Sequence, residues 1–212
     1  MKTQAEISAI IEELKKLYPD ALCSLEYQKD YELLFSVRLA AQCTDARVNL
    51  VTPALFERFP TLEAFAAATP DEVGEYVRSC GFWRAKARDI VSSAQMLLRD
   101  FGGKVPDNMD DLLRLPGVGR KTANLILGDV YGKEGYVCDT HCIRITGRLG
   151  ITDGSKDPLK VEQQLRKAIP PEESSDFCHR MVLHGRALCM ARGPKCEECP
   201  LKALCDYGAN PQ

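Results

Sequence analysis

The stretch of sequence that decides the fold is MDDLLRLPGVGRKTANLILGDVYG, residues 109–132. Its pattern predicts a short helix over 110–115, a tight turn over 116–119 and a second helix over 120–131. Two glycines lie two residues apart in the turn, where they permit positive φ angles and let the backbone come close to a partner. We therefore predict a helix-hairpin-helix motif here rather than an ordinary connection between two helices.

The backbone of this turn is a candidate phosphate-binding site. The N–H groups of Gly117, Val118 and Gly119, and those of the first turn of the second helix, are expected to point outward without partners. Unpaired N–H groups at a helix N-terminus attract phosphate and do not read base sequence. We therefore predict that these three residues contact the backbone of a nucleic acid.

Lys121 is an unusual residue for its position. A cation in the first turn of a helix faces the positive end of the helix dipole, which is unfavourable. The same field favours the neutral amine, and burial would add to that effect. A neutral amine is the form that Schiff-base chemistry requires. Lys121 is therefore a candidate nucleophile, and one more phosphate contact is the alternative.

A carboxylate follows eighteen residues after Lys121, in the segment VCDTH at 137–141. Asp139 or Thr140 is expected to cap the helix that begins there. A carboxylate beside a nucleophilic lysine would also complete an acid/base pair, because it could hold a proton and stabilise positive charge on a sugar ring. Asp139 is therefore a candidate catalytic residue, with helix capping as the alternative.

The ten cysteines fall into two groups. Six are scattered through apolar stretches, where a free cysteine behaves as a small hydrophobe. The other four crowd into seventeen residues near the C-terminus: Cys189, Cys196, Cys199 and Cys205. Four thiolates at this spacing suit zinc and an iron–sulfur cluster equally well. The tail is therefore predicted to hold a metal cofactor, and ligand chemistry alone does not decide which.

The composition indicates a globular protein of the cytoplasm. Hydrophobic residues make up 45% of the chain and charged residues 27%, both ordinary values. No apolar run approaches the length that a membrane-spanning helix needs. The first twenty residues mix acidic side chains through the apolar positions, which argues against a signal or transit peptide. We therefore expect no membrane partner and, in a reducing compartment, no disulfide framework.

The formal net charge of −2 is unlike that of a typical nucleic-acid-binding domain, but the basic residues are clustered. Residues 112–150 hold six basic against three acidic side chains, residues 177–196 hold four basic and no acidic ones, and FWRAKAR at 82–88 holds three basic ones. Clusters on one face would form a positive surface for DNA. Solvated helix faces would give the same counts.

Helical periodicity runs through nearly the whole chain. Helices are expected over 5–17, 31–42, 44–59 and 86–101, with two short ones starting at 60–61 and 69–71. Thr44 or Asp45 is expected to cap the third of these. No stretch alternates as a strand would. We therefore expect an all-α fold of about ten helices joined by short loops.

Three motifs together resemble the endonuclease III family of the helix-hairpin-helix DNA glycosylase superfamily. They are LPGVGRKTAN at 115–124, DTH at 139–141 and the late cysteine quartet, and the similarity covers nearly the whole chain. The resemblance implies an all-α protein of two helical lobes with DNA bound in the cleft between them.

The resemblance also implies how the chain divides into domains. Residues 22–133 would form a six-helix barrel domain that contains the helix-hairpin-helix at about 109–132. Residues 1–21 would join 134–212 to form a helical iron–sulfur cluster domain.

By the same resemblance, Lys121 is the catalytic lysine and Asp139 the catalytic aspartate of a DNA glycosylase and AP lyase of base excision repair. The implied reaction is attack on C1′ of a flipped nucleotide, release of the base, a Schiff base, and β-elimination of the 3′ phosphate. Flipping is required because C1′ is not accessible inside the base stack. The implied partner is double-stranded DNA with an oxidised pyrimidine or an abasic site, bound by a monomer that associates with the nucleoid.

The resemblance extends to the cofactor. The cysteine spacing is similar to the cluster motif of the family, which implies a [4Fe-4S] cluster held by Cys189, Cys196, Cys199 and Cys205. Arg192 and Lys195 lie between the first two of these cysteines. They are candidate phosphate contacts, and solvated surface is the alternative for both.

Two further segments resemble the loops that family members insert into DNA. In AAQCTD, residues 40–45, Gln42 matches the residue that occupies the position vacated by the flipped base. In CGFWRAKA, residues 80–87, Phe82 matches an apolar wedge where a leucine is found in the family. An aromatic ring can stack on a base at such a position, and a place in the core is the alternative. Trp83 is expected to serve packing.

Two other functions remain open from the sequence. One is a mismatch-specific glycosylase of the same superfamily, acting on thymine, uracil or adenine; the adenine enzymes usually lack a lysine at position 121 and carry an extra C-terminal domain. The other is a DNA-binding module without enzymatic activity that uses only the hairpin and the cluster.

Overall fold

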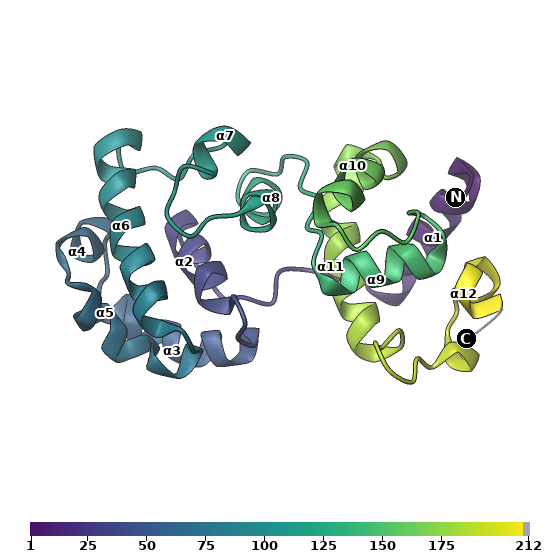
Figure 1. The fold of residues 1–212 in the computed structure, drawn as a ribbon, viewed down its shortest axis with the longest axis horizontal. Helices are drawn as coiled ribbons and strands as arrows, with labels where there is room; N and C mark the ends of the chain where they lie inside the picture. The colour runs from purple at the N-terminus through teal and green to yellow at the C-terminus, as the bar shows by residue number, and fades with distance from the viewer. Residues whose placement is uncertain (210–212) are drawn as a thin grey trace. The chain divides into compact units, whose positions relative to one another are not determined.

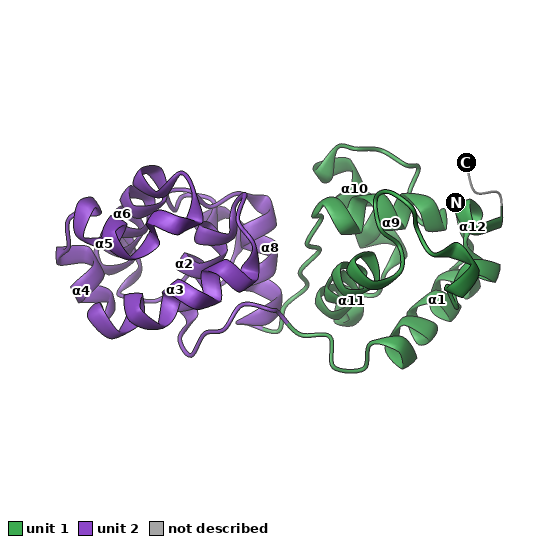
Figure 2. Cartoon of the chain, turned by 90° about the horizontal axis from the view of Figure 1, so that it is seen from below, with its two compact units in different colours: residues 1–22, 132–212 green, residues 23–131 purple. Residues whose placement is uncertain are grey.

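The computed structural model describes residues 1–209. Within that range the regular structure is helical throughout, with no strand, which confirms the all-α prediction (Figure 1). The chain divides into two compact units: unit 1, Met1–Leu22 with Gly132–Gln212, and unit 2, Cys23–Tyr131 (Figure 2). The divisions predicted from the sequence, after residue 21 and after residue 133, lie close to these.

Unit 2 is built around two central helices. Its helices are α2 (Asp30–Ala40), α3 (Asp45–Arg58), α4 (Leu62–Ala67), α5 (Pro70–Val77), the 3-10 turn η1 (Arg78–Cys80), α6 (Trp83–Phe101), α7 (Met109–Leu112) and α8 (Arg120–Asp129). The long helix α6 packs against α4 and α5, and α2 packs against α3, α6 and α8. Helix α2 therefore connects the long helix α6 to the hairpin helix α8.

Threonines start three of these helices. The side chains of Thr44, Thr61 and Thr69 each accept a hydrogen bond from the backbone N–H three residues later. Such a cap satisfies one of the N–H groups that a helix start leaves unpaired. The predicted cap at Thr44 is thereby confirmed, as are two short helices beginning close to 60–61 and 69–71.

An aromatic cluster forms the centre of the core of unit 2. The ring of Phe65 lies 5.0 Å from that of Phe35 and 5.1 Å from that of Phe59, centroid to centroid. All three side chains are buried. Burial of one such side chain contributes about 1.5–3 kcal/mol to folding, so this cluster fixes how α2 meets α4.

Unit 1 joins the two ends of the chain. Its helices are α1 (Gln4–Leu17), α9 (Thr140–Leu149), α10 (Pro158–Ala168), η2 (Pro171–Glu173), α11 (Ser174–Ala187), η3 (Cys196–Glu198), η4 (Lys202–Leu204) and α12 (Asp206–Ala209). Helix α11 packs against both α1 and α9. The apolar face of α1, with Ile10 and Leu14 fully buried, is covered in this way by a helix from the far end of the sequence.

Several helix ends differ from the prediction. The first helix of the hairpin is shorter than expected, because α7 ends at Leu112 and Leu115 N donates instead to Leu112 O in a tighter turn. Pro116 explains this, since a residue that precedes proline is disfavoured in the α-helical region. Helix α6 begins at Trp83, three residues before the predicted start, and α8 ends at Asp129 rather than 131. None of the helices in residues 1–209 is long and apolar enough to cross a membrane.

Candidate functional site

The hairpin turn has the glycine geometry that the sequence predicts. Gly117 has a φ of +75°, the left-handed region that favours glycine. One expectation was wrong, however: the N–H of Val118 is not free, because it donates to Leu115 O at 3.1 Å. The turn bends back on itself at this residue, and the hydrogen bond closes it. The N–H groups of Gly117 and Gly119 have no partner within residues 1–209.

Helices α2 and α6 hold the turn in place. Ser93 Oγ donates to Pro116 O at 3.0 Å, and Arg38 Nε donates to Asp89 Oδ2 at 2.8 Å directly beneath the turn. A Cβ atom at Gly117 would lie only 2.5 Å from Arg38 Nε. The turn therefore needs glycine at this position for two reasons, the positive φ angle and the close approach of the ion pair.

Helix α8 begins without a capping side chain. Its N-cap residue is Gly119, and the N–H groups of Gly119 and Lys121 have no partner in the described part of the chain. Helices α1, α9 and α10, by contrast, are capped by Thr3, Asp139 and Asp157. The start of α8 therefore offers free N–H groups and the positive end of a helix dipole, the combination that binds an anion.

Lys121 lies in the first turn of α8 and is exposed. Among the described residues no carboxylate pairs with its amine. The sequence allows burial as one effect that favours the neutral amine. Because Lys121 is exposed, that effect is absent in the free protein. The amine is instead accessible to whatever binds at the start of the helix.

Asp139 caps α9, as the sequence allows. Its Oδ1 accepts a hydrogen bond from Cys142 N at 2.7 Å, and the side chain is half-buried. Its Oδ2 has no partner among residues 1–209. One carboxylate oxygen is therefore fixed by the helix, while the other is available for a second interaction. Asp139 belongs to unit 1, whereas Lys121 belongs to unit 2.

Gln42 and Phe82 share a backbone conformation that is rare for such residues. Their φ angles are +55° and +44°, and within residues 1–209 no other residue except glycine has a positive φ. Left-handed backbone is strained for residues with a side chain, and such strain clusters at functional sites. The two residues that the family resemblance selects as inserting residues are thus the same two that adopt this strained backbone among residues 1–209.

Phe82 does not belong to the core. Its side chain is 72% exposed, which excludes the alternative of a packing role. Gln42 is exposed as well. Trp83, in contrast, packs as expected: a Cβ atom at Gly74 would lie 2.4 Å from its ring, and the guanidinium of Arg84 lies 4.3 Å from the ring centroid.

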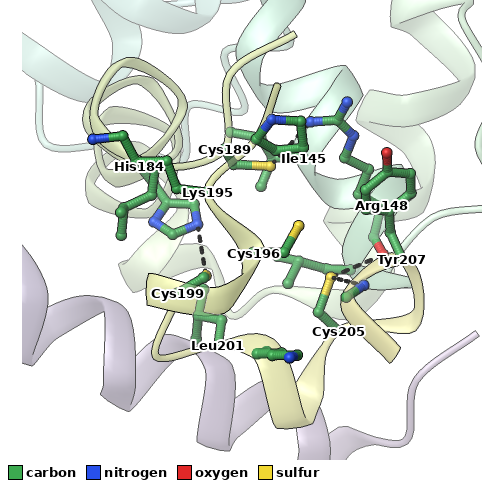
Figure 3. A pocket seen from close by; sticks show the side chains of 15 residues that line it. Ile145, Arg148, His184, Cys189, Lys195, Cys196, Cys199, Leu201, Cys205 and Tyr207 are labelled. Atoms are coloured by element: carbon green, nitrogen blue, oxygen red, sulfur yellow. Dashed lines mark hydrogen bonds between the residues drawn. The ribbon is translucent and has the colours of Figure 1, made fainter. Parts of the chain in front are cut away.

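The four late cysteines line one cavity in unit 1 (Figure 3). Cys189 follows α11, Cys196 begins η3, Cys199 follows η3, and Cys205 follows η4. The loop between the first two is closed by Lys195 N, which donates to Leu188 O at 2.9 Å. Ile145, Leu149 and Leu201 add an apolar lining. The turns therefore bring to one place four thiols that span seventeen residues of sequence.

The surroundings of these thiols fit a bound iron–sulfur cluster. Donors already face the sulfurs: Arg148 Nη1 lies 3.3 Å from Cys189 Sγ, and Gly208 N lies 3.3 Å from Cys205 Sγ. Burial raises the pKa of the Cys199 and Cys205 thiols, and neighbouring cysteines add to that shift. Half-buried thiolates of this kind need a positive partner, which the iron atoms of a cluster supply.

His184 completes the wall of this cavity. It is fully buried, and burial lowers its pKa to about 4, so the ring is neutral at pH 7. Its Nδ1 lies 3.1 Å from the Tyr18 hydroxyl and its Nε2 lies 3.7 Å from Cys199 Sγ. Sequence reasoning missed this residue, since nothing in its spacing from the cysteines marks it.

The basic residues are less available than their sequence clustering suggests. Arg144 donates to Cys189 O at 2.9 Å, and Arg148 donates to Met190 O at 2.8 Å, so both anchor the loop that follows α11. Arg180 is buried and pairs with Asp176 at 3.3 Å. Arg192 and Lys195 remain exposed on the same loop and stay candidates for phosphate contacts.

Two protein-family models match the chain. Residues 35–171 match the HhH-GPD superfamily of base excision DNA repair proteins, and residues 189–205 match the iron-sulfur binding domain of endonuclease III. The first match contains the hairpin, Lys121 and Asp139, and the second begins and ends on a cysteine of the quartet. The fold and the site thus define a base excision DNA repair protein of the HhH-GPD superfamily.

Similar proteins of known identity indicate which family of this superfamily the chain resembles most. Endonuclease III of Synechocystis sp. is 47% identical over 193 residues, which cover 91% of this chain and 88% of the relative. Endonuclease III of Bacillus subtilis is 39% identical over 96% of this chain and 93% of that protein, and that of Escherichia coli is 36% identical over 93% of each. The chain belongs to the endonuclease III family.

Solved structures agree with this assignment. A trapped endonuclease III–DNA covalent intermediate, an estranged-adenine complex, matches with a TM-score of 0.92 and 42% identity over 99% of this chain and 98% of that one. A thermostable thymine-DNA glycosylase matches with a TM-score of 0.85 at 20% identity, which shows a shared fold alone. Family membership confirms two predictions: an enzyme of base excision repair, a DNA glycosylase and AP lyase, and an iron–sulfur cofactor.

Proposed function

We propose that this protein binds double-stranded DNA as a monomer, excises oxidised pyrimidines, and cleaves the resulting abasic site through a Schiff base on Lys121. The exposed position of Lys121 in the first turn of the uncapped helix α8 carries the proposal. A phosphate held by the free N–H groups at that helix start would lie beside the lysine amine. The cytoplasm, with DNA of the nucleoid as partner, is the corresponding location.

The proposed reaction begins with the amine of Lys121 as the nucleophile. The lone pair of Lys121 Nζ forms a bond to C1′ of a flipped nucleotide while the bond from C1′ to the base breaks, and the base leaves with that electron pair and a proton. Opening of the sugar gives a Schiff base. Loss of a C2′ proton then forms a C2′–C3′ double bond and expels the 3′ phosphate. Hydrolysis returns the free amine, so the lysine acts in both steps.

The proposed role of Asp139 is to stabilise positive charge on the sugar and to receive a proton from the attacking amine. The Oδ2 atom, which α9 does not use, suits that role. Gln42 and Phe82 are proposed to fill the gap that the flipped nucleotide leaves, since both are exposed on strained backbone. Gly117, Val118 and Gly119 are proposed to contact phosphate, Gly117 and Gly119 through free N–H groups.

The cysteine cavity is proposed to hold a [4Fe-4S] cluster through Cys189, Cys196, Cys199 and Cys205. When bound, the iron atoms compensate the charge of the four thiolates and hold η3 and η4 in place. Arg192 and Lys195 then lie on a fixed loop, where they are proposed to contact DNA phosphates. The chemistry at C1′ uses only the amine and carboxylate.

Borohydride trapping tests the proposal. Wild-type protein is incubated with duplex DNA that carries one abasic site, and borohydride reduces any Schiff base to a stable adduct. We expect an adduct from the wild type and none from Lys121→Ala. Lys104→Ala, which removes another exposed lysine of unit 2, is the matched control and should trap like the wild type.

The substrate is tested on a panel of duplexes that each carry one lesion. Oxidised pyrimidines should be released faster than a thymine or uracil mismatch. Release of a base with no borohydride adduct would indicate a mismatch glycosylase without lyase activity instead. DNA binding with neither release nor trapping would leave only a binding module.

A further inference from the structure

Lys86 is a charged side chain in the core of unit 2. It is 1% exposed, although it belongs to the basic segment at 82–88. Its Nζ donates to Leu39 O at 2.8 Å and to Cys80 O at 2.6 Å. Burial lowers the pKa of this amine, because it disfavours the charged form. Burying an amine costs free energy, and an apolar side chain would fill the same space without that cost. The hydrogen bonds of Lys86 therefore call for an explanation.

The two acceptors lie at the ends of the two elements that lead into the loops with the candidate inserting residues. Leu39 lies in the last turn of α2, three residues before Gln42, and Cys80 ends η1, two residues before Phe82. These loops lie far apart in sequence: Lys86 reaches forty-seven residues back to Leu39 and six residues back to Cys80. One buried amine therefore ties both loops to helix α6.

Both loops are strained at their tips. Gln42 and Phe82 have positive φ angles, and both are exposed, so packing of their own side chains does not hold them there. Strained backbone persists only where the surrounding structure fixes it. The hydrogen bonds from Lys86 are attached just before each strained residue, where they fix the direction in which the chain leaves α2 and η1.

A second contact joins the same loops. The Cys80 thiol, whose pKa is raised to about 11 mainly by burial, also interacts with the Cys43 thiol. Cys43 directly follows Gln42. The two loops are therefore linked by these thiols as well as by the Lys86 amine.

We propose that Lys86 is a positioning residue that holds the Gln42 and Phe82 loops in register for simultaneous insertion into DNA at the flipped nucleotide. The inference rests on the proposed function, since it assigns a purpose to two residues that are proposed to contact DNA. Lys86 itself does not touch DNA or the reacting atoms. It acts through the two carbonyl groups.

The test compares two reactions. Excision of a damaged base from duplex DNA depends strongly on insertion of Gln42 and Phe82, whereas Schiff-base formation at an abasic site depends on it less. Excision from duplex DNA requires the damaged base to be unpaired and flipped, whereas an abasic site has no base to unpair. We expect Lys86→Met, which keeps the volume and removes both hydrogen bonds, to slow single-turnover excision about tenfold or more, because flipping then loses its support. Borohydride trapping on a preformed abasic site should fall much less. Lys86→Gln, which keeps an N–H donor, should lie between Lys86→Met and wild type.

Controls separate positioning from stability. Leu97→Ala also removes a fully buried side chain of α6, far along the helix from both loops, and its melting temperature is measured together with that of the Lys86 variants. This variant should reduce excision and trapping equally or leave both unchanged. A Lys86 variant that reduced both steps in the same proportion would overturn the proposal. If Lys86→Met does not fold, the same comparison is made with Lys86→Gln.

Coupling gives an independent measurement. If Lys86 acts through the two loops, then Lys86→Gln should add little to the loss already caused by Gln42→Ala with Phe82→Ala. Additive losses would show that Lys86 acts elsewhere and would overturn the inference. A wild type that neither excises nor traps would refute the proposed function itself, a result that is separate from both outcomes.

Discussion

Helices α8 and α9 begin in opposite ways. Helix α8 starts at Gly119 with no capping side chain, while α9 starts at Asp139, whose Oδ1 accepts the Cys142 N–H at 2.7 Å. Each start holds one of the two candidate catalytic residues, Lys121 on α8 and Asp139 on α9. The start of α8 leaves N–H groups and the positive end of its dipole available to an external anion. The start of α9 pairs one of its N–H groups with its own capping carboxylate.

The difference shows how each residue is prepared for its role. An uncapped start leaves the helix less stable by itself, but a bound phosphate completes it and brings the DNA to the lysine. A self-capped start fixes a carboxylate in one orientation before any partner arrives, because the oxygen that caps the helix cannot turn away. Preorganisation of this kind is what charge stabilisation in a transition state requires. Capping and catalysis are therefore compatible readings of Asp139.

The largest expected effect comes from Asp139→Asn, which separates those two readings. Asparagine caps a helix about as well as aspartate, so the melting temperature should change little. Loss of the charge should reduce single-turnover excision by about 10² to 10⁴, the range typical of a lost acid/base group. DNA affinity should be retained. Normal excision by this variant would reduce Asp139 to a helix cap.

Asp139→Ser completes that experiment as its control. Serine keeps the cap without a carboxylate, so it should match asparagine in both stability and loss of excision. Asp139→Ala, which also lacks the cap, should be less stable by about 1 kcal/mol. Urea unfolding measures these differences.

Gly117→Ala should destabilise the hairpin turn that precedes α8. A left-handed φ of +75° is strained for alanine, at a cost of about 1–3 kcal/mol. The new Cβ atom would also lie 2.5 Å from Arg38 Nε and 2.7 Å from Asp89 Oδ2. We expect lower stability in urea and weaker DNA binding. Gly154→Ala, with a φ of +81° and no atom within 4 Å of the added Cβ, should cost less.

Gly119→Ser gives α8 a capping side chain, as α9 already has. Of these variants it should change stability and DNA binding the least. No atom lies within 4 Å of a Cβ atom at this position, and φ is −106°, so serine fits without strain. The new hydroxyl would cap α8 and raise stability by a few tenths of a kcal/mol. It would also occupy an N–H group that the DNA is proposed to use. We expect affinity for abasic duplex DNA, measured by fluorescence anisotropy, to fall about threefold to tenfold, the loss of about one ordinary hydrogen bond. Unchanged affinity would mean that this helix start does not bind phosphate.

Local sequence signals predicted most of the fold. Threonine before an acidic or apolar stretch marked the starts of α3, α4 and α5, because capping depends on residues only three positions apart. The glycine and proline of the hairpin marked its turn for the same reason. The hydrogen bond from Val118 N to Leu115 O was missed, since it depends on how tightly the turn closes and not on residue type.

Long-range contacts were beyond such signals. Clustering in the sequence predicts Arg144 and Arg148 to be part of a basic surface, yet they bind the carbonyl groups of a loop more than forty residues away. The basic segment at 82–88 likewise predicts Lys86 to be a surface charge, whereas it is buried. Its place between Trp83 and Ile90 on the apolar stripe of α6 is a signal that could have identified it as buried. Which carbonyl groups it meets depends on how α2 and η1 pack, and that is set by the whole of unit 2.

The division into units also has a consequence for how the protein is made. Unit 2 is one continuous stretch, Cys23–Tyr131, so it can fold as soon as that stretch has been synthesised. Unit 1 cannot fold so early, because α1 packs against α11 and the four clustered cysteines begin only at residue 189. At translation rates of about 5–20 residues per second, residues 132–212 take roughly 4–16 s. The apolar face of α1 lacks its native cover until α11 has been made, and the site for the cluster is incomplete until Cys205 has been added.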